Sequence, residues 1–362
     1  CMKIVLIQQY ASPSFGILAI MTYLRHYGIN CEVVVWSLEK KPADAIHELK
    51  PDLIGISLMS TEHLWMVEAV KNIRQKLPTT KIIVGGIHAV IYPEEILAVQ
   101  GVDLVCNSDG ENVLVETCRA LDEGKSDLSL IKGLAYKDEN GVARSTGRAD
   151  FYNYSSDIIE DRTPYFTRYP VMAKDTVPRF IASRGCPYNC SFCYNGQIKS
   201  IFKDSHNKYL RYKEPENLIQ EISNICRKYP VESIFFVDDL FSANKKWLSQ
   251  FLDIYKKEIG YPFMCTTRAN LMTEELAKML SGAGCRTISF GVETGNAVIR
   301  EKILNKKISD IQLIECGQIA RKYGMQVQTS NMFCLPEETL EDAYKTIELN
   351  QKAGTQQPFC SL

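Results

Sequence analysis

Short apolar runs alternate with amphipathic stretches along the first third of the chain. The apolar runs are typical of buried strands and span residues 3–7, 31–36, 53–58, 81–84 and 102–106. The stretches between them carry apolar residues at helical spacing and span residues 16–27, 42–49, 64–77, 93–99 and 111–123. Strands that alternate with helices of this length predict an α/β fold with a parallel, doubly wound, Rossmann-like sheet. In such a sheet, ligands bind at the carboxyl ends of the strands.

The alternation stops between about residues 134 and 179. Two short β-rich runs flank Asn140-Gly141 and predict a hairpin, because Asn and Gly tolerate the positive φ of a tight turn. The segment after the hairpin has no apolar period and is rich in Asp, Ser, Tyr and Pro. Its aromatic residues are poor choices for a solvated tether, so we expect an ordered linker. We therefore place a first domain at residues 2–144 and the linker at residues 145–178.

A second series of alternating strands and helices occupies residues 179–362. Its predicted strands span residues 180–183, 233–237, 263–267, 287–292, 326–333 and 358–362. Its predicted helices span residues 218–229, 245–259, 274–283, 310–323 and 340–353, with Thr273 and Ser309 as N-caps. This pattern predicts a partial (β/α)6 barrel whose site lies where the strands end. Because the sixth strand pattern coincides with the last residues, we expect a barrel that is truncated at its C-terminus.

Composition and charge narrow the classes of function. The chain has 42 basic and 43 acidic residues and a net charge of -1, so it lacks the global basic field that attracts nucleic acid. Its sequence contains no run of about 18 apolar residues that would span a membrane, and its N-terminus lacks the apolar length of a signal peptide. We therefore expect a cytoplasmic protein without a membrane span, and we do not expect nucleic acid as a partner.

Cysteine is the unusual residue of this composition, with 13 copies. Ten are scattered, and we expect them to serve as small apolar residues in packing: Cys1, Cys31, Cys106, Cys118, Cys226, Cys265, Cys285, Cys316, Cys334 and Cys360. The other three are Cys186, Cys190 and Cys193, on the loop after the first barrel strand. Thiolates this closely spaced are suitable ligands for an iron–sulfur cluster, whereas structural zinc needs a fourth ligand and no matching pair follows at the usual spacing. Three thiolates leave one iron of a four-iron cluster open for a substrate or cosubstrate.

This Cys-x3-Cys-x2-Cys motif, with Phe192 before its last cysteine and a barrel strand ahead of it, resembles the motif of the radical S-adenosylmethionine (SAM) superfamily. The resemblance covers about residues 177–362. It implies a 4Fe-4S cluster that is bound by Cys186, Cys190 and Cys193 and whose open iron binds SAM. It also implies that one electron from the cluster cleaves SAM to a 5′-deoxyadenosyl radical, which abstracts hydrogen from an unactivated carbon.

The ends of other barrel strands supply candidates for the same site. Asp238 and Asp239 close the second strand, where related enzymes place groups that receive the methionyl ammonium of SAM or the substrate. We assign Asp238 to the cofactor and Asp239 to catalysis, and the alternative for both is a helix N-cap before Asn244. Arg268 ends the third strand, where it is a catalytic candidate that would pair with a carboxylate.

Three further barrel positions follow from the resemblance. Glu293 lies among glycines at the end of the fourth strand, and it resembles the family residue that accepts hydrogen bonds from the ribose of SAM. Tyr194 matches the family position whose backbone meets adenine. Thr329 and Asn331 on the fifth strand are weaker candidates for contacts with SAM or substrate.

A doubly wound domain ahead of such a barrel resembles the cobalamin-binding subgroup of the superfamily. The candidates for cobalamin binding lie at strand ends and are Ser57, Met59, Ser60, Gly85, Gly86, His88, Gly110 and Glu111. The loop of residues 8–16 lacks the Asp-x-His-x-x-Gly that ligates cobalt in many cobalamin enzymes, so cobalt should receive no histidine from it. We expect His88 to be structural or to contact the nucleotide tail, not cobalt. A plain nucleotide-binding domain is disfavoured, because no Gly-x-Gly-x-x-Gly follows the first strand.

The combined resemblance implies a cobalamin-dependent radical SAM enzyme similar to the class B methyltransferases. Such an enzyme transfers a methyl group from methylcobalamin to an unactivated carbon after the deoxyadenosyl radical has abstracted a hydrogen atom. One alternative is a radical SAM oxidoreductase or cyclase that binds cobalamin without methyl transfer, and another is a non-catalytic metal-binding or cobalamin-sensing protein. The expected partners are a small-molecule or peptide substrate and an electron donor such as flavodoxin or ferredoxin.

Overall fold

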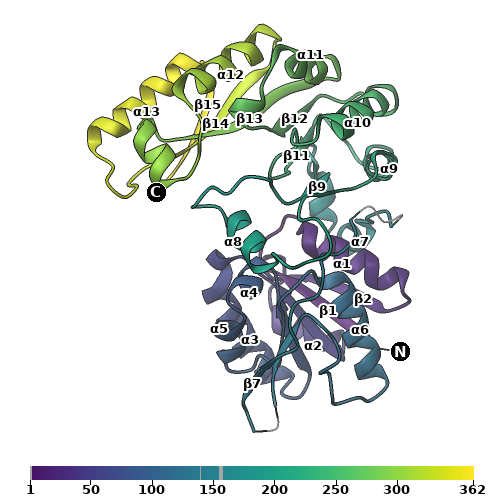
Figure 1. Ribbon diagram of the computed structural model, residues 1–362. Helices are drawn as coiled ribbons and strands as arrows, with labels where there is room; N and C mark the ends of the chain where they lie inside the picture. Colours follow the sequence, from purple (N-terminus) through teal and green to yellow (C-terminus); the bar gives the residue numbers. More distant parts are fainter. Residues whose placement is uncertain (1, 139, 155–157) are drawn as a thin grey trace. The chain divides into compact units, whose positions relative to one another are not determined.

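The computed structural model describes residues 2–138, 140–154 and 158–362, which form two compact units (Figure 1). Among these residues, unit 1 contains those up to 153 together with 158–174 and 197–208. Unit 2 contains residue 154, residues 175–196 and residues 209–362. The chain therefore passes between the units more than once.

Unit 1 is built on a seven-stranded sheet with the order β2-β1-β3-β4-β5-β6-β7. Its strands are β1 (Lys3–Gln8), β2 (Asn30–Val35), β3 (Leu53–Ser57), β4 (Lys81–Gly85), β5 (Leu104–Cys106), β6 (Leu134–Lys137) and β7 (Ala143–Ser145). The pairs among β1 to β5 are parallel, and β6 and β7 add an antiparallel hairpin at one edge. The predicted parallel sheet and hairpin are confirmed.

Helices cover both faces of this sheet because the connections between parallel strands must cross over it. They are α1 (Phe15–His26), α2 (Pro42–Glu48), α3 (His63–Lys76), α4 (Ile87–Ile91), α5 (Pro93–Ala98) and α6 (Gly110–Asp122). Helix α1 packs beside α6, and α2 packs beside α3. The central strands are buried on both faces, which explains their continuous apolar runs; Val5, Ile54 and Ile82 are fully buried in the core.

The aromatic segment after the hairpin is ordered where the structure describes it. It contains the short helix α7 (Thr163–Arg168) and the 3-10 turn Pro170–Lys174. Tyr165 is fully buried and donates a hydrogen bond from its hydroxyl to Oε1 of Gln8 at 2.6 Å. These contacts fix residues 158–174 onto unit 1. The segment is thus ordered, as its aromatic content predicts.

Unit 2 is built on a six-stranded sheet with the order β15-β14-β13-β12-β11-β8. Its strands are β8 (Arg179–Phe180), β11 (Ile234–Phe236), β12 (Phe263–Thr266), β13 (Cys285–Glu293), β14 (Gln326–Met332) and β15 (Gln357–Ser361), and all neighbours are parallel. The helices α9 (Pro215–Cys226), α10 (Lys245–Glu258), α11 (Glu274–Gly282), α12 (Asp310–Lys322) and α13 (Leu340–Ala353) connect them and lie along one side of the sheet (Figure 1). This is the predicted partial (β/α)6 barrel. Thr273 and Ser309 cap α11 and α12 as predicted, by accepting bonds from Leu276 N and Gln312 N.

Three features near the cysteine motif and on the loop after β13 are absent from the sequence-based prediction. The predicted first barrel strand is split, because Ser183–Arg184 (β9) leaves the sheet and pairs antiparallel with Arg211–Tyr212 (β10). A helix, α8 (Tyr194–Ile201), begins directly after the last cysteine of the motif. A π-helical turn spans Ile299–Ile303. All three surround the cysteine motif or lie on the loop after β13, where sequence periodicity is interrupted.

The scattered cysteines only partly fulfil the expected packing role. Six are buried, as predicted: Cys31, Cys106, Cys118, Cys265, Cys285 and Cys316. Cys226 is half-buried. The prediction is wrong for Cys334 and Cys360, which are exposed because they lie on the loop after β14 and on the exposed strand β15. Cys1 lies outside the described residues.

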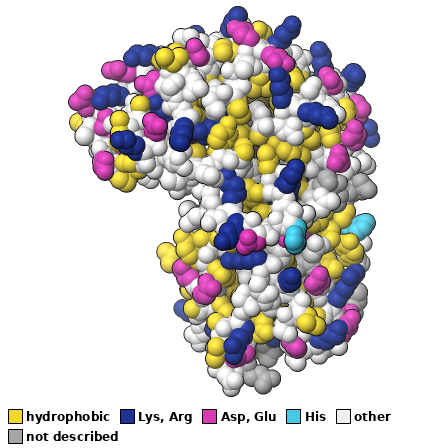
Figure 2. Space-filling model, viewed as in Figure 1, with side chains coloured by type: hydrophobic (Ala, Val, Ile, Leu, Met, Phe, Trp, Pro, Cys, Tyr) yellow, Lys and Arg dark blue, Asp and Glu magenta, His cyan; other side chains and the backbone are white. Residues whose placement is uncertain are grey.

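Charge and hydropathy at the surface agree with the composition. Basic and acidic side chains are interspersed over the visible face of each unit (Figure 2). Among the described residues, no helix combines the length and the apolar character that crossing a bilayer requires.

Candidate active site and cofactor pockets

The three cysteines of the motif lie at a pocket formed by the carboxyl ends of the barrel strands. Cys186, Cys190 and Cys193 are all partly exposed on the loop between β9 and α8. The pocket has about 760 Å³ of empty space between the loop and the ends of β11 to β14. The predicted position of the cysteine motif, at the end of the barrel strands, agrees with this arrangement.

The cysteine loop is held in place by the end of the π-helical turn and the residues that follow it. The backbone N–H of Ser191 donates to the carbonyl oxygen of Leu304 at 3.0 Å, and its hydroxyl donates to that of Ile303 at 2.5 Å. The side-chain amide of Asn305 donates to the carbonyl oxygen of Asn189 at 2.7 Å. These bonds fix the backbone between the first and last cysteines without occupying a sulfur atom.

The turn before the first cysteine requires glycine. Gly185 has φ +92, and a Cβ atom at this position would lie 2.7 Å from the backbone oxygen of Tyr209. Any other residue would combine backbone strain with a clash against the main chain. Gly185 therefore allows Cys186 to enter the pocket directly after β9.

Hydrogen-bond donors point at two of the sulfur atoms. Nη1 of Arg268 lies 3.5 Å from Sγ of Cys190, and the side-chain amide of Asn195 donates to Sγ of Cys193 at 3.2 Å. The Arg268 guanidinium stacks on Tyr188, with 3.8 Å between its central carbon and the ring centroid. Within the described part of the chain, Nε of Arg268 has no hydrogen-bond partner although it is buried. A negatively charged sulfur cluster would suit these donors, so the residues present fit a cluster at this loop.

The partner of Arg268 differs from the sequence-based expectation. The sequence suggests a carboxylate partner, whereas the structure directs Arg268 to the cysteine loop and to Tyr188. The physical reason is the strand end: Arg268 lies where β12 meets the pocket, whose wall also contains the cysteine loop.

Asp239 lies in the pocket, as its assignment requires. The hydroxyl of Tyr194 donates to both of its carboxylate oxygens, at 2.9 and 3.0 Å. Asp239 is exposed to the pocket, and partial desolvation by the surrounding pocket wall raises the pKa of its carboxyl group. Burial, and then the charge of Asp239, raise the pKa of Tyr194 as well, so its hydroxyl stays a donor. The backbone contact predicted for Tyr194 stays a prediction.

Asp238 lies outside the pocket. It is 1% exposed and accepts hydrogen bonds from the backbone N–H of Ala182 at 3.1 Å and from the hydroxyl of Ser183 at 2.5 Å. Desolvation raises the pKa of Asp238 to about 6. Its carboxylate is therefore committed to joining β11 to the segment between β8 and β9. The alternative role of N-cap is filled by Asn244, which accepts from the N–H of Trp247 at 3.1 Å.

Glu293 and Lys306 form a buried ion pair on the pocket wall. Oε1 of Glu293 lies 2.6 Å from Nζ of Lys306, and both side chains are less than 10% exposed, at 8% and 7%. Gly291 makes room for the pair, because a Cβ there would lie 1.8 Å from Oε1 of Glu293. Sequence reasoning identified Glu293 but missed Lys306, which comes from an irregular segment after the π-helical turn and carries no local signal.

The fifth barrel strand presents a different residue from the two expected. Ser330 lines the pocket, whereas Thr329 and Asn331 are buried on the other face of β14. Both bond to Asn350 of α13: Thr329 donates to its Oδ1 at 2.5 Å, and Asn350 donates to Oδ1 of Asn331 at 2.7 Å. Because successive strand residues face opposite sides, the alternation itself is the signal that would have singled out Ser330.

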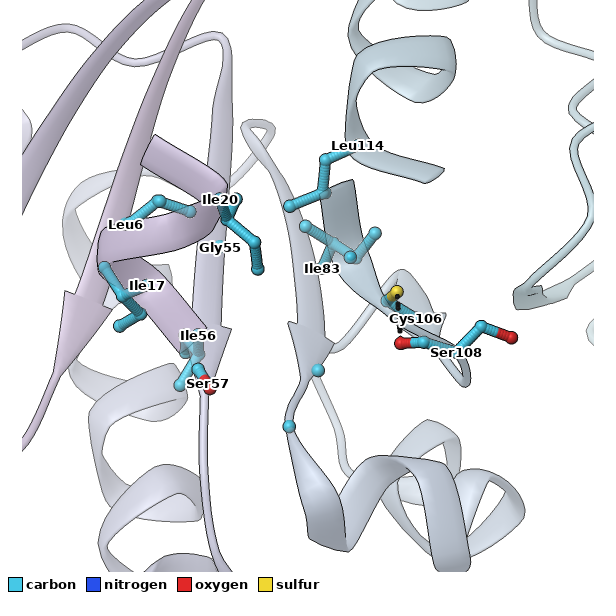
Figure 3. Close-up of a pocket in the computed structure, with 13 residues that line it drawn as sticks. Leu6, Ile17, Ile20, Gly55, Ile56, Ser57, Ile83, Cys106, Ser108 and Leu114 are labelled. Atoms are coloured by element: carbon cyan, nitrogen blue, oxygen red, sulfur yellow. Dashed lines mark hydrogen bonds between the residues drawn. The ribbon is translucent and has the colours of Figure 1, made fainter. Parts of the chain in front are cut away.

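Unit 1 contains a second pocket, which is mostly apolar and has about 400 Å³ of empty space (Figure 3). Four predicted cobalamin residues line it, namely Ser57, Gly85, Gly86 and Gly110. The rest of the wall is formed by Leu6, Ile17, Ile20, Gly55, Ile56, Ile83, Cys106, Ser108 and Leu114. The pocket therefore lies between the carboxyl-terminal halves of β3 to β5 and the helices α1 and α6, where a doubly wound sheet binds ligands.

Three glycines of this pocket lie at closely packed positions where a side chain would clash with its neighbours. A Cβ at Gly86, which has φ +92, would lie 2.5 Å from the backbone oxygen of Leu58. A Cβ at Gly55 would lie 2.6 Å from Cδ2 of Leu6, and one at Gly110 would lie 2.7 Å from Cδ1 of Ile20. A narrow apolar slot bordered by glycine backbone fits the flat nucleotide tail of a corrinoid. Sequence reasoning missed Gly55, because a glycine inside a strand is the only local signal for it.

The other four residues predicted to bind cobalamin lie outside this pocket. Met59 is 57% exposed after β3, and Glu111 is buried in the first turn of α6. The hydroxyl of Ser60 lies 3.0 Å from Nδ1 of His88, which is 6% exposed. Ser60 and His88 therefore belong to a separate polar cluster at the same edge of the sheet.

Two family models match this chain. The B12 binding domain model matches residues 5–117, which include the sheet of unit 1 from β1 to β5. The Radical SAM superfamily model matches residues 180–349, which include the cysteine loop and the pocket around it.

Curated proteins and solved structures also resemble the chain. An uncharacterized methyltransferase of Pyrococcus horikoshii is 28% identical over 86% of this chain and 66% of its own length. An anaerobic magnesium-protoporphyrin IX monomethyl ester cyclase of Rubrivivax gelatinosus is 24% identical over 85% of this chain and 56% of its own length. The chain thus spans about half to two thirds of the length of these relatives. The structure of the radical SAM methyltransferase TsrM of Kitasatospora setae matches with a TM-score of 0.82 at 16% identity, over 99% of this chain and 72% of that one. This last match confirms the predicted fold.

Proposed function

This chain belongs to the radical SAM superfamily and carries a B12-binding domain, and from that premise we propose a cobalamin-dependent radical SAM enzyme that methylates an unactivated carbon. The family prediction made from the cysteine motif and the domain order is thereby confirmed. The relatives favour methyl transfer, because a methyltransferase is among the curated relatives and the matched solved structure is a methyltransferase.

One observation carries the proposal: three partly exposed thiols share a pocket with inward-pointing donors and a buried ion pair at the barrel strand ends. Cys186, Cys190 and Cys193 would hold a 4Fe-4S cluster. When bound, the cluster and cobalamin would supply the electron for SAM cleavage and the carrier for the methyl group. These cofactors would carry out the bond-breaking and bond-forming steps, and the protein would hold and orient them.

The remaining residues of the pocket have roles that suit SAM. Glu293 would accept hydrogen bonds from the ribose hydroxyls, and Lys306 beside it would pair with the methionyl carboxylate. Asp239 would receive the methionyl ammonium or a polar group of the substrate from its place in the pocket wall. Arg268 would donate to the cluster sulfurs instead of to a substrate carboxylate. Asp238 would act only through the strand end that it fixes.

In unit 1, the glycine-bordered pocket would receive the nucleotide tail of cobalamin. Its apolar wall suits an aromatic ring, and Gly85, Gly86 and Gly110 place no side chain in the path of the sugar that carries the ring. Ser57 would offer a hydroxyl to the tail from the end of β3. Met59 lies nearer the solvent, where it would contact the outer part of the cofactor.

The second candidate function is a cobalamin-binding radical SAM cyclase or oxidoreductase that transfers no methyl group. The observation that favours it is the resemblance to an anaerobic magnesium-protoporphyrin IX monomethyl ester cyclase. A non-catalytic cobalamin sensor is less suitable, because the acidic and basic groups of the barrel pocket would then have no purpose. From the sequence we keep as further predictions a cytoplasmic location, a small-molecule or peptide substrate, and reduction by flavodoxin or ferredoxin.

The full chain, reconstituted anaerobically with iron, sulfide and hydroxocobalamin, tests the proposal. With dithionite and SAM that carries a labelled methyl group, we expect 5′-deoxyadenosine and also label recovered with the bound corrinoid. Formation of 5′-deoxyadenosine without any label on the corrinoid would favour the cyclase or oxidoreductase.

A variant of the cysteine motif tests whether the formation of 5′-deoxyadenosine depends on the cluster. Cys190→Ala should lose the cluster iron and all 5′-deoxyadenosine formation while keeping the corrinoid. A matched control is Cys226→Ala, which removes a half-buried cysteine of α9 outside the motif. A Cys190→Ala protein that kept full iron and full SAM cleavage would contradict the radical SAM assignment.

A further inference from the structure

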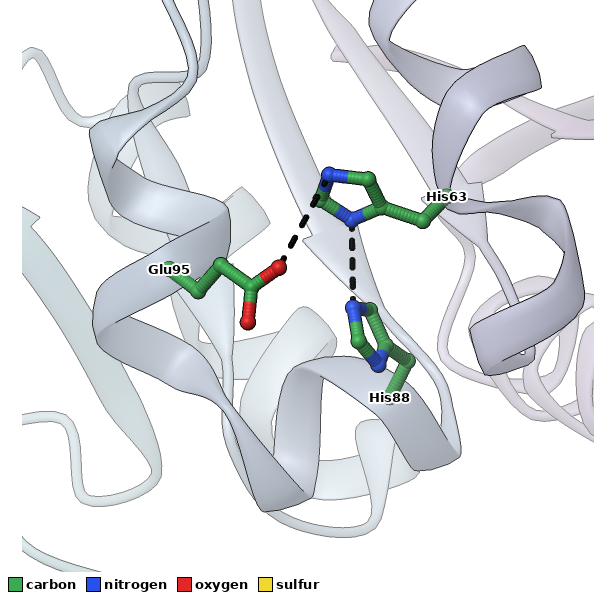
Figure 4. A group of neighbouring side chains, drawn as sticks. All are labelled: His63, His88 and Glu95. Atoms are coloured by element: carbon green, nitrogen blue, oxygen red, sulfur yellow. Dashed lines mark hydrogen bonds and ion pairs between the residues drawn. The ribbon is translucent and has the colours of Figure 1, made fainter.

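Three metal-ligating side chains meet at the carboxyl edge of the unit 1 sheet, outside both pockets (Figure 4). His63 is the first residue of α3, His88 lies in α4, and Glu95 lies in the first turn of α5. Each offers one ligand atom, and these atoms all lie within 4.8 Å of one another. Three separate elements thus converge on one point, which differs from the chance proximity of residues on one helix face.

The distances suit one ion. Nδ1 of His63 lies 3.1 Å from Nε2 of His88. Two imidazole nitrogens that each bind zinc at about 2.0–2.1 Å are separated by roughly 3 Å. Oε1 of Glu95 lies 3.9 Å from the other ring nitrogen of His63, Nε2, and its side chain is 56% exposed, so it has room to turn toward an ion between Nδ1 of His63 and Nε2 of His88. The ligand atoms of the three residues lie within 4.8 Å of one another. Two nitrogens and one carboxylate oxygen are a ligand set that zinc uses when it keeps an open fourth position.

The buried histidine is oriented for ligation. Ser60 lies 3.0 Å from Nδ1 of His88 and fixes the ring so that Nε2 faces His63. Histidine ligands of metals usually bond through the other ring nitrogen to such an outer partner. Burial, and then the neighbouring His63, lower the pKa of His88. A neutral imidazole is the form that binds a metal.

We propose that His63, His88 and Glu95 bind one divalent transition-metal ion of the zinc type, with its fourth position open to water. Imidazole and carboxylate together favour zinc-like ions over magnesium or calcium, which prefer oxygen ligands alone. The site goes beyond the iron and the cobalt of the proposed function, because it uses none of the cysteines and none of the residues that line the unit 1 pocket.

The ion would fasten the loops that border that pocket. His63 follows the turn after β3, and His88 follows Gly86 at the end of β4. The N–H of His88 already donates to the carbonyl oxygen of Leu58 at 3.4 Å, a long bond that joins the same two loops. A metal bridge to Glu95 would join both loops to α5 and make the pocket wall more rigid.

The test uses the full chain loaded with its iron–sulfur cluster and hydroxocobalamin, equilibrated with zinc chloride and then freed of unbound metal. Elemental analysis should find one zinc ion per chain. His63→Ala and Glu95→Gln, at partly exposed positions that tolerate substitution, should lower the zinc content at least tenfold and leave the iron content unchanged. The matched control is His47→Ala, because His47 is an exposed histidine of α2 outside the cluster.

A second measurement, of the melting temperature, distinguishes a loss of zinc binding from a loss of folding. Zinc should raise the melting temperature of the wild-type chain and of His47→Ala but leave that of His63→Ala unchanged, since only a ligand bound to the folded state stabilises it. Equal zinc content in wild type and His63→Ala would overturn the proposal. So would a cob(II)alamin electron paramagnetic resonance spectrum whose nitrogen splitting disappears in His63→Ala, since the imidazole would then belong to cobalt.

Discussion

The barrel pocket of unit 2 and the apolar pocket of unit 1 are shaped by opposite means. The barrel pocket of unit 2 is lined by charged and polar side chains that point at the cysteine sulfurs or pair with each other, such as Arg268 and the Glu293–Lys306 pair. The pocket of unit 1 is lined mostly by isoleucine, leucine and glycine, and Gly55, Gly86 and Gly110 lie where a Cβ atom would clash with its neighbours. The barrel pocket is defined by the hydrogen-bond donors and the ion pair of its side chains. The unit 1 pocket is defined by apolar side chains and by glycines, which carry none.

This difference follows from the chemistry of the proposed ligands. A reactive cluster and a zwitterionic cosubstrate carry charge, so they need donors and acceptors fixed in advance in a partly desolvated space. A nucleotide tail brings a flat ring that needs room and apolar contact. Substitutions should therefore change ligand binding through side-chain volume in unit 1 and through side-chain charge in unit 2.

The largest expected effect is a loss of cobalamin binding on adding one methyl group in unit 1. In Gly86→Ala the new Cβ would lie 2.5 Å from the backbone oxygen of Leu58, at a backbone with φ +92. Strain and clash together should lower the free energy of unfolding by about 3 kcal/mol and close the pocket. We expect the purified chain to lose its bound corrinoid while its iron content stays that of the wild type.

A matched glycine distinguishes the clash from backbone strain. Gly124 also has a positive φ, +71, but a Cβ there meets open space. Gly124→Ala should therefore lose only about 1 kcal/mol of stability and keep its corrinoid. Retained corrinoid in Gly86→Ala, measured by absorbance after gel filtration, would show that the tail does not enter this pocket.

In unit 2, a change of charge at constant volume should matter most. Glu293→Gln leaves Lys306 with an uncompensated buried charge, which should cost about 3 kcal/mol of stability. It also removes the acceptor proposed for the ribose hydroxyls, so we expect SAM to bind at least tenfold more weakly to the cluster-loaded chain. Isothermal titration with SAM measures this affinity under anaerobic conditions.

A second buried ion pair in the same unit provides the control. Lys213 and Glu221 lie 2.7 Å apart and are 6% and 4% exposed, away from the barrel pocket. Glu221→Gln should destabilise the protein about as much as Glu293→Gln does, yet leave the affinity for SAM unchanged. Equal loss of SAM affinity in both variants would mean that the effect of Glu293 is only structural.

The stability of unit 2 should also depend on pH, through Asp238. The residues that line the unit 1 pocket include no Asp or Glu. Burial raises the pKa of Asp238 from 3.8 to about 6 in the folded state. The folded state then binds more protons than the unfolded state between these values, so stability is fully present below about pH 4 and falls as pH rises to 6. Urea unfolding at pH 4.5 and pH 6.5 should show a smaller difference in Asp238→Asn than in wild type.

Asp239→Asn is the companion variant for this measurement. Desolvation also raises the pKa of Asp239, but its carboxyl faces the pocket and bonds to the Tyr194 hydroxyl. It should therefore flatten the pH dependence less than Asp238→Asn does, and it should impair the binding of SAM or substrate more. An unchanged pH dependence in Asp238→Asn would mean that Asp238 does not titrate in this range.

Sequence patterns predicted the fold because the information they carry is local. Buried parallel strands need continuous apolar runs and their helices need an apolar face, so both sheets follow from periodicity. The cysteine motif is equally local, since its three ligands lie within eight residues on one loop. The pocket glycines Gly85 and Gly86 were also found, because a pair of glycines after a strand is a local signal.

Long-range pairing could not be predicted from the same patterns, whereas the face on which a side chain lies could be. Asp238 and Asp239 are adjacent, and composition alone does not distinguish which carboxylate lies in the pocket. The alternation in β11 contained the answer: Asp238 continues the buried positions Ile234 and Phe236, so it faces away from the pocket that Asp239 enters. Lys306 reaches Glu293 only through the fold of an irregular segment, for which no sequence period exists.

The smallest expected effect concerns Arg268, which would tune the cluster without binding SAM. Its Nη1 lies 3.5 Å from Sγ of Cys190, and a charged donor at a sulfur atom stabilises the reduced, more negative state of a cluster. Arg268→Gln should therefore lower the reduction potential by roughly 50 mV, since about 1 kcal/mol corresponds to that shift for one electron. Redox titration followed by electron paramagnetic resonance measures this potential.

Arg286→Gln on β13 is the control, because Arg286 is exposed and absent from the pocket wall among the described residues. If the potential moved equally in both variants, the general charge of unit 2 would set it, and the contrast between directed donors and open space would lose its support in the barrel.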